Sequence, residues 1–325
     1  MLATFAPEGP GQCSGLPVRR YSADTLAREL GPEFELAEAV SHRHRTPSGS
    51  CQPFLYARFR RVPADAPILS GKDAAAPSIF SPITVLTEAA RQKRLPGLRV
   101  PSVCVLDPDG DIVRWLQRTG RGERSQTWAC YHSELYEFDL AGQRVGIVGC
   151  AVGAPYAVLV AEQLFACGCE LLVSVTSSGQ IARVADPPYF VLVTRSLRDE
   201  GTSYHYQPSA RFAEASPALL EAARAALRTA GISVVEGATW TTDAPFREIQ
   251  AAVSNAEGEG ILAVEMESAA LYAFAAARDR AVLCFAHVTN TMGGSEREFE
   301  KGHDEGVTES LEIIKSLLGF TRTGC

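Results

Sequence analysis

Residues 144–177 read RVGIVGCAVGAPYAVLVAEQLFACGCELLVSVTS. The segment RVGIVGC is predicted as a strand, APYAVLVAEQLFACG as a helix and CELLVSVTS as a second strand. Gly149 and Gly153 bracket the turn from the first strand into the helix. Near-continuous apolar strands separated by a helix are typical of a sheet that is buried on both faces. This stretch therefore indicates an α/β fold.

The same alternation continues over most of the chain. Further apolar strands are predicted at VPSVCVL, YFVLVTRSL, ISVVEGATW and RAVLCFAHVTN, and helices at SPALLEAARAALRTAG and MESAALYAFAAARD. We expect one three-layer α/β/α domain over residues 79–325, with helices on both faces of a central sheet.

The N-terminal part has a different character. Residues 1–20 are rich in Gly and Pro and are predicted to be disordered, and residues 63–78 read as a linker. Between them, residues 21–62 predict a helix (SADTLAREL) and a β-hairpin (FELAEAV and PFLYARFRR), which are too small to form a core alone. Residues 21–61 resemble the C-terminal tail of class I S-adenosylmethionine-dependent methyltransferases without their cofactor-binding part, which implies a structural remnant or docking element.

The composition excludes several classes of protein. The 325 residues are 46% hydrophobic and carry a net charge of −7, which excludes a largely disordered chain and argues against a nucleic-acid partner. The start MLATFAPEGPGQ has no secretory pattern, and the uncharged run Val145–Ala161 is broken by Gly and Pro, so no membrane span is expected. Nine cysteines without a CxxC pair predict buried thiols in a cytoplasmic protein, with no metal site.

Polar residues follow the predicted strands, where α/β sheets gather their ligands. The turn at Gly149 and Gly153 lets backbone approach a ligand, although a tight turn without a ligand explains it equally well. SVTSSGQI holds Ser174, Thr176, Ser177 and Ser178 before Gly179, and this hydroxyl cluster suits phosphate or sugar, or an ordinary loop.

Two carboxylates, Glu265 and Glu267, interrupt the apolar run GILAVEMESAALYAFAAA. Burying unpaired carboxylates is costly, so we expect them to face a polar cavity or fixed partners. A favourable helix N-terminus explains Glu267 alone. A carboxylate that binds two neighbouring hydroxyls of a sugar explains why this residue type is needed.

The segments RDEGTSYHY and WTTDAPFREI concentrate aromatic and charged side chains. Arg198, His205, Trp240, Phe246 and Arg247 together suit a flat heterocycle with carbonyl acceptors. A solvated loop or a subunit interface is the alternative for RDEGTSYHY.

From about Pro101 to the C-terminus, with VEMES as the most specific part, these segments resemble the nucleoside phosphorylase superfamily. That family includes purine nucleoside and uridine phosphorylases and methylthioadenosine/adenosylhomocysteine nucleosidases. The resemblance implies an α/β/α sandwich with a central mixed sheet, a homo-oligomer of dimers, trimers or hexamers, and cleavage of the bond between ribose and base. It implies no cofactor, with a nucleoside as substrate and phosphate as co-substrate.

The resemblance also assigns roles. Glu267 would hold the ribose 2′- and 3′-hydroxyls, Met266 would pack beneath the sugar, and Glu265 would support their loop. Phe246 would lie against the base, with Arg247 directed at a base carbonyl. The loop that starts at Arg198 would lie near the base and the subunit interface, and the remaining substrate-binding positions would be Gly153, Thr176, Ser177 and Gly179.

Three departures from the family concern the nucleophile and the base. In LDPDGDIVRW, Pro108 and Ile112 stand where the phosphorylases have a phosphate-binding glycine and arginine, and Ser174 stands where a second arginine is usual. Asp107, Asp109 and Asp111 weaken the site for phosphate, unless Arg114 or an arginine of a neighbouring subunit compensates. Asp111 fits the place of the acidic residue that activates water in the nucleosidases, although DPDG is also a strong turn sequence.

The third departure is Asn290 in HVTNTM, where purine-cleaving members often carry an aspartate. Asparagine only donates and accepts hydrogen bonds, so it favours a uridine-like or 6-oxopurine substrate. We therefore expect phosphorolysis of such a nucleoside, giving free base and ribose 1-phosphate. Hydrolysis through Asp111 and a non-catalytic nucleoside-binding module are the alternatives. A dinucleotide oxidoreductase does not fit, because the Gly149 turn lacks the GxGxxG pattern.

Overall fold

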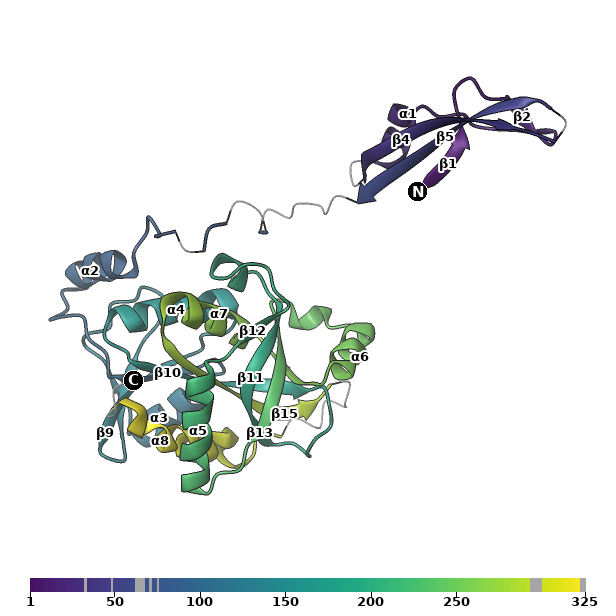
Figure 1. The fold of residues 1–325 in the computed structure, drawn as a ribbon. Helices are drawn as coiled ribbons and strands as arrows, with labels where there is room; N and C mark the ends of the chain where they lie inside the picture. Colours follow the sequence, from purple (N-terminus) through teal and green to yellow (C-terminus); the bar gives the residue numbers. More distant parts are fainter. Residues whose placement is uncertain are drawn as a thin grey trace. The chain divides into compact units, whose positions relative to one another are not determined.

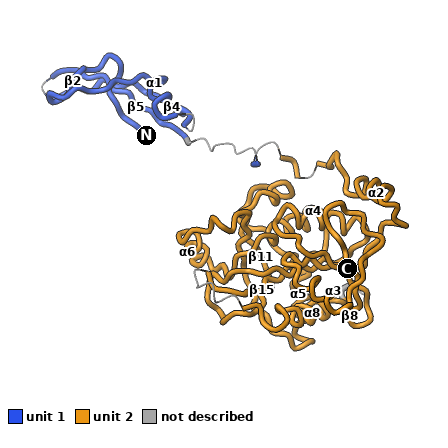
Figure 2. Tube along the Cα trace, turned by 180° about the vertical axis from the view of Figure 1, so that it is seen from behind, with its two compact units in different colours: residues 1–70 blue, residues 71–325 orange. Residues whose placement is uncertain are grey.

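The computed structural model describes residues 1–31, 34–47, 49–61, 68–69, 72–74, 76–292 and 300–321. The chain divides into two compact units, Met1–Ser70 and Gly71–Cys325 (Figure 2). Most of the linker predicted over residues 63–78 lies outside the described residues. Within the described part of the chain, no helix is long and apolar enough to cross a membrane.

The first unit is a small sheet covered by one helix. Strands β1 (Leu2–Phe5), β5 (Cys51–Arg61) and β4 (Phe34–Arg45) form an antiparallel sheet in the order β1-β5-β4, and β2 (Gln12–Cys13) pairs with β3 (Leu16–Pro17). The prediction that residues 1–20 are disordered is therefore wrong. The short apolar segment LATF pairs with the open edge of β5, a long-range contact that the surrounding Gly and Pro residues conceal.

Helix α1 (Ala23–Leu30) begins after Ser22, whose hydroxyl accepts the backbone N–H of Thr25. The small core beneath it contains Leu26 and Leu55.

The second unit is built on a 10-stranded mixed sheet. The strand order is β12-β11-β13-β14-β10-β6-β9-β8-β7, and β15 pairs with both β10 and β11. Its strands are β6 (Val103–Asp107), β7 (Glu123–Arg124), β8 (Tyr136–Leu140), β9 (Gln143–Gly149), β10 (Leu171–Gln180), β11 (Tyr189–Asp199), β12 (Phe212–Glu214), β13 (Val235–Thr242), β14 (Ile261–Glu265) and β15 (Ala281–Thr291).

Helices cover both faces of this sheet (Figure 1). Helix α4 packs on α2 and α7, whereas α8 packs on α3 and α5. The helices are α2 (Pro82–Lys93), α3 (Asp111–Thr119), α4 (Ala154–Ala166), α5 (Pro217–Ala230), α6 (Gln250–Gly258), α7 (Ser268–Arg278) and α8 (Val307–Ser316). The three-layer α/β/α fold with a central mixed sheet is confirmed.

Strand β10 brings the candidate residues together. It runs parallel to β6 and to β15, and its last residues pair with β14 in antiparallel register. The carboxyl ends of β6, β10 and β15 therefore meet at one edge, next to the end of β14. A β-bulge falls between Ser178 and Gly179, so that Gly179 pairs with Asn290.

Candidate active site

Glu265, at the end of β14, accepts hydrogen bonds from three segments of the chain. It is 3% exposed, and its Oε1 accepts the hydroxyls of Thr241 (2.6 Å), Thr239 (3.0 Å) and Ser196 (3.2 Å). Its Oε2 accepts the backbone N–H groups of Glu267 (2.8 Å) and Ser268 (2.7 Å). Five donors thus surround one buried carboxylate, and they hold the turn from β14 into α7 in place.

Glu267 lies two residues after Glu265, directly before α7, and has different hydrogen-bond partners. It is 1% exposed, and its Oε1 accepts the backbone N–H of Gly153 at 2.7 Å. Its Oε2 accepts the hydroxyl of Thr176 (2.9 Å) and the backbone N–H of Met266 (3.3 Å). Gly153 has φ +90°, a conformation that favours glycine, and it precedes helix α4. Burial and the charge of Glu265 raise the pKa of Glu267 to about 8.

Asp107 ends β6 and stabilises the turn that follows. Its carboxylate is 2% exposed and accepts the backbone N–H groups of Gly110 (3.1 Å) and Val113 (2.9 Å). Burial, together with the charges of Asp109 and Asp111, raises the pKa of Asp107 to about 7 despite these hydrogen bonds. The carboxylate therefore points into the start of α3 rather than toward a ligand.

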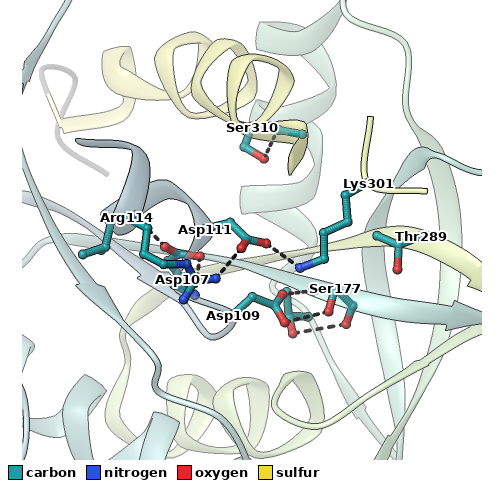
Figure 3. A network of polar contacts seen from close by, with 12 residues as sticks. Asp107, Asp109, Asp111, Arg114, Ser177, Thr289, Lys301 and Ser310 are labelled. Carbon is teal, nitrogen blue, oxygen red and sulfur yellow. Dashed lines mark hydrogen bonds and ion pairs between the residues drawn. The ribbon is translucent and has the colours of Figure 1, made fainter. Parts of the chain in front are cut away.

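Asp109 reaches the hydroxyl-rich end of β10 (Figure 3). Its Oδ2 accepts the backbone N–H of Ser177 and its Oδ1 accepts the Ser177 hydroxyl, both at 2.8 Å. The neighbouring residue Thr176 contacts Glu267, so Asp109 and Glu267 approach the same stretch of β10.

Asp111 begins helix α3 and pairs with two cations (Figure 3). It accepts hydrogen bonds from Lys301 Nζ at 2.6 Å and from the guanidinium of Arg114. Glu300 donates its backbone N–H to the carbonyl of Thr289 at 2.8 Å, which holds the segment that carries Lys301 against the end of β15. Burial opposes the charge of Lys301, but the hydrogen bond to Asp111 and the charge of Asp109 outweigh it and raise the pKa of Lys301.

No pattern in the sequence indicated that Lys301 lies at this site. It lies 190 residues from Asp111 in the chain, outside every motif that resembles the family, and only the fold brings the two together.

Asn290 and its neighbours line the adjacent part of this edge. Thr289 donates its hydroxyl to Asn290 Oδ1 at 3.3 Å, and Met292 covers Gly179 so closely that an added Cβ would lie 2.5 Å from its sulfur. Ser174 is 1% exposed, and its hydroxyl has no hydrogen-bond partner among the described residues.

The structure does not bring all predicted residues into this cluster. Phe246 lies in a short 3₁₀ turn and is 99% exposed, and its predicted place against a base stays a prediction. Arg247 lies beside it, and its backbone N–H donates to the carbonyl of Ala244 at 2.8 Å.

Arg198 organises a loop instead of facing a ligand. It donates to the Ser203 hydroxyl (2.8 Å) and to the carbonyls of Pro208 (2.7 Å) and Gln207 (3.2 Å). Its guanidinium also stacks on Tyr204 at 4.4 Å, and burial lowers its pKa. These contacts use the guanidinium of Arg198 within its own loop, and the position of that loop near the base stays a prediction.

The chemistry of this cluster suits a polar, hydroxylated ligand. Carboxylates at Glu267 and Asp109, hydroxyls at Thr176 and Ser177, and the cation Lys301 meet at the strand ends. In the described part of the chain, no group of three or more His, Cys, Asp or Glu side chains is arranged to hold a metal ion. A sheet of this order with such a cluster at its carboxyl edge defines an α/β enzyme-type fold with a site for a small ligand.

Comparisons with known proteins identify the family. The model of the phosphorylase superfamily matches residues 110–319, and the chain belongs to this superfamily. Purine nucleoside phosphorylase DeoD-type of Psychromonas ingrahamii is 27% identical over 174 residues, which are 53% of this chain and 74% of that protein. The DeoD-type enzyme of Bacillus cereus is 28% identical over the same shares of both chains.

A solved structure shows the same fold. Uridine phosphorylase from Vibrio fischeri superimposes with a TM-score of 0.58 at 21% identity, covering 69% of this chain and 93% of that one. The resemblance to the nucleoside phosphorylase superfamily is thus confirmed. The resemblance of residues 21–61 to a methyltransferase tail stays a prediction.

Proposed function

We propose that this protein cleaves the N-glycosidic bond of a nucleoside by phosphorolysis. In this reaction the C1′–N bond breaks, its electron pair leaves with the base, which gains a proton, and a phosphate oxygen forms the new bond to C1′. The products are the free base and ribose 1-phosphate. The observation that carries the proposal is the buried carboxylate of Glu267 at the strand ends of a phosphorylase-superfamily chain.

Glu267 suits the ribose because its acceptor capacity is not exhausted. An ionised carboxylate offers about four acceptor positions, and the chain occupies three of them, of which the bond from Met266 is long at 3.3 Å. A ribose hydroxyl can take the fourth position or replace Met266. Glu267 is protonated below its pKa of about 8. Once it is ionised, its negative charge beside the sugar stabilises the positive charge that develops on the ribose as the bond breaks.

Cations and an amide complete the proposed site. Lys301 and Arg114, both paired with Asp111, would stand in for the arginines that the phosphate-binding segments lack. Asn290 offers one donor and one acceptor to a base, which supports a uridine-like or 6-oxopurine substrate. The purine nucleoside phosphorylases and the uridine phosphorylase among its relatives fit both choices.

The setting of the enzyme is part of the proposal. All eight cysteines in the described residues are free thiols, which supports a reducing, cytoplasmic location. The fully exposed ring of Phe246 supports a homo-oligomer, since an adjacent subunit would cover it and bring it to the base.

Hydrolysis is the second candidate, and one specific contact favours it. Asp109 occupies the two Ser177 donors that phosphate would use. Water would then attack C1′, with Asp111 as the base. We expect Asp111→Asn to abolish release of the base by a hydrolase and to spare a phosphorylase, because only the hydrolase needs a proton acceptor for water.

The test is incubation with uridine, inosine, guanosine, adenosine and methylthioadenosine, each with and without phosphate. Free base is measured by chromatography. Release that requires phosphate supports phosphorolysis, and release without phosphate supports hydrolysis. Nucleoside binding without any release would replace both with a non-catalytic binding module. Glu267→Gln should lose activity, whereas Glu257→Gln, an exposed position on α6, is the matched control.

A further inference from the structure

The contact between Asp109 and Ser177 resembles the binding of an external anion. Two carboxylate oxygens each take one donor of the same residue, the backbone N–H and the hydroxyl, at 2.8 Å. Two oxygens of a phosphate bind a backbone N–H and a hydroxyl in the same manner. The carboxylate of Asp109 therefore occupies the backbone N–H and the hydroxyl of Ser177, which an external anion would otherwise bind.

Neither of the other two aspartates of this segment does so. Asp107 accepts backbone N–H groups within its own turn, and Asp111 pairs with Lys301 and Arg114. Among the described residues, Asp109 is the aspartate of this segment that bonds to Ser177 (Figure 3). The contact joins positions 68 residues apart, so it results from the fold and not from the local turn.

We infer that Asp109 is a specificity-determining residue that competes with phosphate for Ser177 and so sets the choice between phosphate and water as nucleophile. While its carboxylate stays on Ser177, phosphate lacks two donors and meets a like charge. When the carboxylate is removed, both Ser177 donors become available to phosphate and the like charge is lost, while Lys301 stays paired with Asp111. The inference rests on the proposed function for its kinetic readout, but not for phosphate binding itself.

The experiment measures binding of inorganic phosphate to the full chain by calorimetry, and the phosphate dependence of base release. Asp109→Ala should bind phosphate about 10- to 100-fold more tightly than the wild type, because two hydrogen bonds to a charged group become available. The KM for phosphate should fall by a similar factor. Asp186→Ala is the matched control, since it removes one exposed carboxylate from the same unit. It should bind phosphate as the wild type does.

Two further variants separate the charge from the contact. In Asp109→Asn the amide oxygen can accept the Ser177 N–H while its NH₂ donates to the hydroxyl, so that only the charge is lost. Its affinity for phosphate should lie between those of the wild type and Asp109→Ala. Adding Ser177→Ala to Asp109→Ala should remove part of the gain, because one of the freed donors is deleted.

Equal phosphate affinity in the wild type, Asp109→Ala and Asp109→Asn, with unchanged tryptophan fluorescence, would overturn the inference. So would a gain that Asp186→Ala reproduces. If the variants bind phosphate more tightly but no nucleoside is cleaved, the role of Asp109 stands and the proposed function fails. If cleavage requires phosphate but neither its KM nor its affinity changes in Asp109→Ala, the proposed function stands and the role of Asp109 fails.

Discussion

The burial of Glu267 links the stability of the second unit to pH. Its side chain is 1% exposed, and burial followed by the charge of Glu265 raises its pKa from 4.5 to about 8. Between these two values the carboxyl group is protonated in the folded protein and ionised in the unfolded chain. Unfolding then releases a proton, so the stabilising contribution is complete below pH 4.5 and is lost as the pH rises through 8.

The size of this effect follows from the two pKa values. Between about pH 5.5 and 7.5, the contribution of Glu267 to the free energy of unfolding should fall by about 2–3 kcal/mol. Glu267→Gln cannot ionise and should lose this fall. Asp107, whose pKa of about 7 is also raised, adds a smaller dependence of the same sign to both proteins. The difference between the wild type and Glu267→Gln therefore isolates Glu267.

The assay is urea unfolding at both pH values, followed by tryptophan fluorescence. Trp115, Trp128 and Trp240 are the three tryptophans of the chain, and all lie in the second unit, so the signal reports on that unit. Glu257→Gln, on the exposed surface of α6, should keep the pH dependence of the wild type. The reasoning is refuted if Glu267→Gln shows the same fall in stability as the wild type.

Two other substitutions, and a second measurement on Glu267→Gln, test the remaining parts of the argument. Glu265→Leu leaves five buried donors without their acceptor, so the free energy of unfolding, measured in urea titrations, should fall by about 3–5 kcal/mol. A loss below about 1 kcal/mol would contradict the role of Glu265. Arg198→Met removes three hydrogen bonds from its loop, so limited proteolysis should cut that loop faster while the sheet stays folded. An unchanged cleavage rate would argue against Arg198 as the residue that holds the loop. Glu267→Gln should lower kcat/KM for base release about 100-fold, measured by chromatography, and unchanged turnover would remove Glu267 from the ribose site.

The apolar strands made the α/β fold predictable. RVGIVGC, CELLVSVTS and RAVLCFAHVTN match β9, β10 and β15, because a strand buried on both faces needs a continuous apolar run. The short helix α6 and the amphipathic helices α3 and α8 were not predicted. Helix α3 follows directly from the aspartate-rich turn, whose polar residues conceal its beginning.

The two glutamates of VEMES were predicted to need fixed partners, and the structure supplies them. The partners themselves were not predictable in detail. The hydroxyls that bind Glu265 come from β11 and β13. Glu267 accepts a hydroxyl from β10 and the backbone N–H of Gly153, just before α4. Which of several Ser and Thr residues reaches a carboxylate depends on strand order and register, which a single sequence does not encode locally.

The sequence by itself determined the class of fold, the family and the residue types at the strand ends. Each depends on local patterns, such as apolar runs, glycine turns and the VEMES motif. Only the tertiary structure decided that Lys301 neutralises Asp111, that Asp109 occupies the donors of Ser177, and that Arg198 serves its own loop. The first two contacts span 190 and 68 residues, and they exist because the sheet brings the ends of β6, β10 and β15 together.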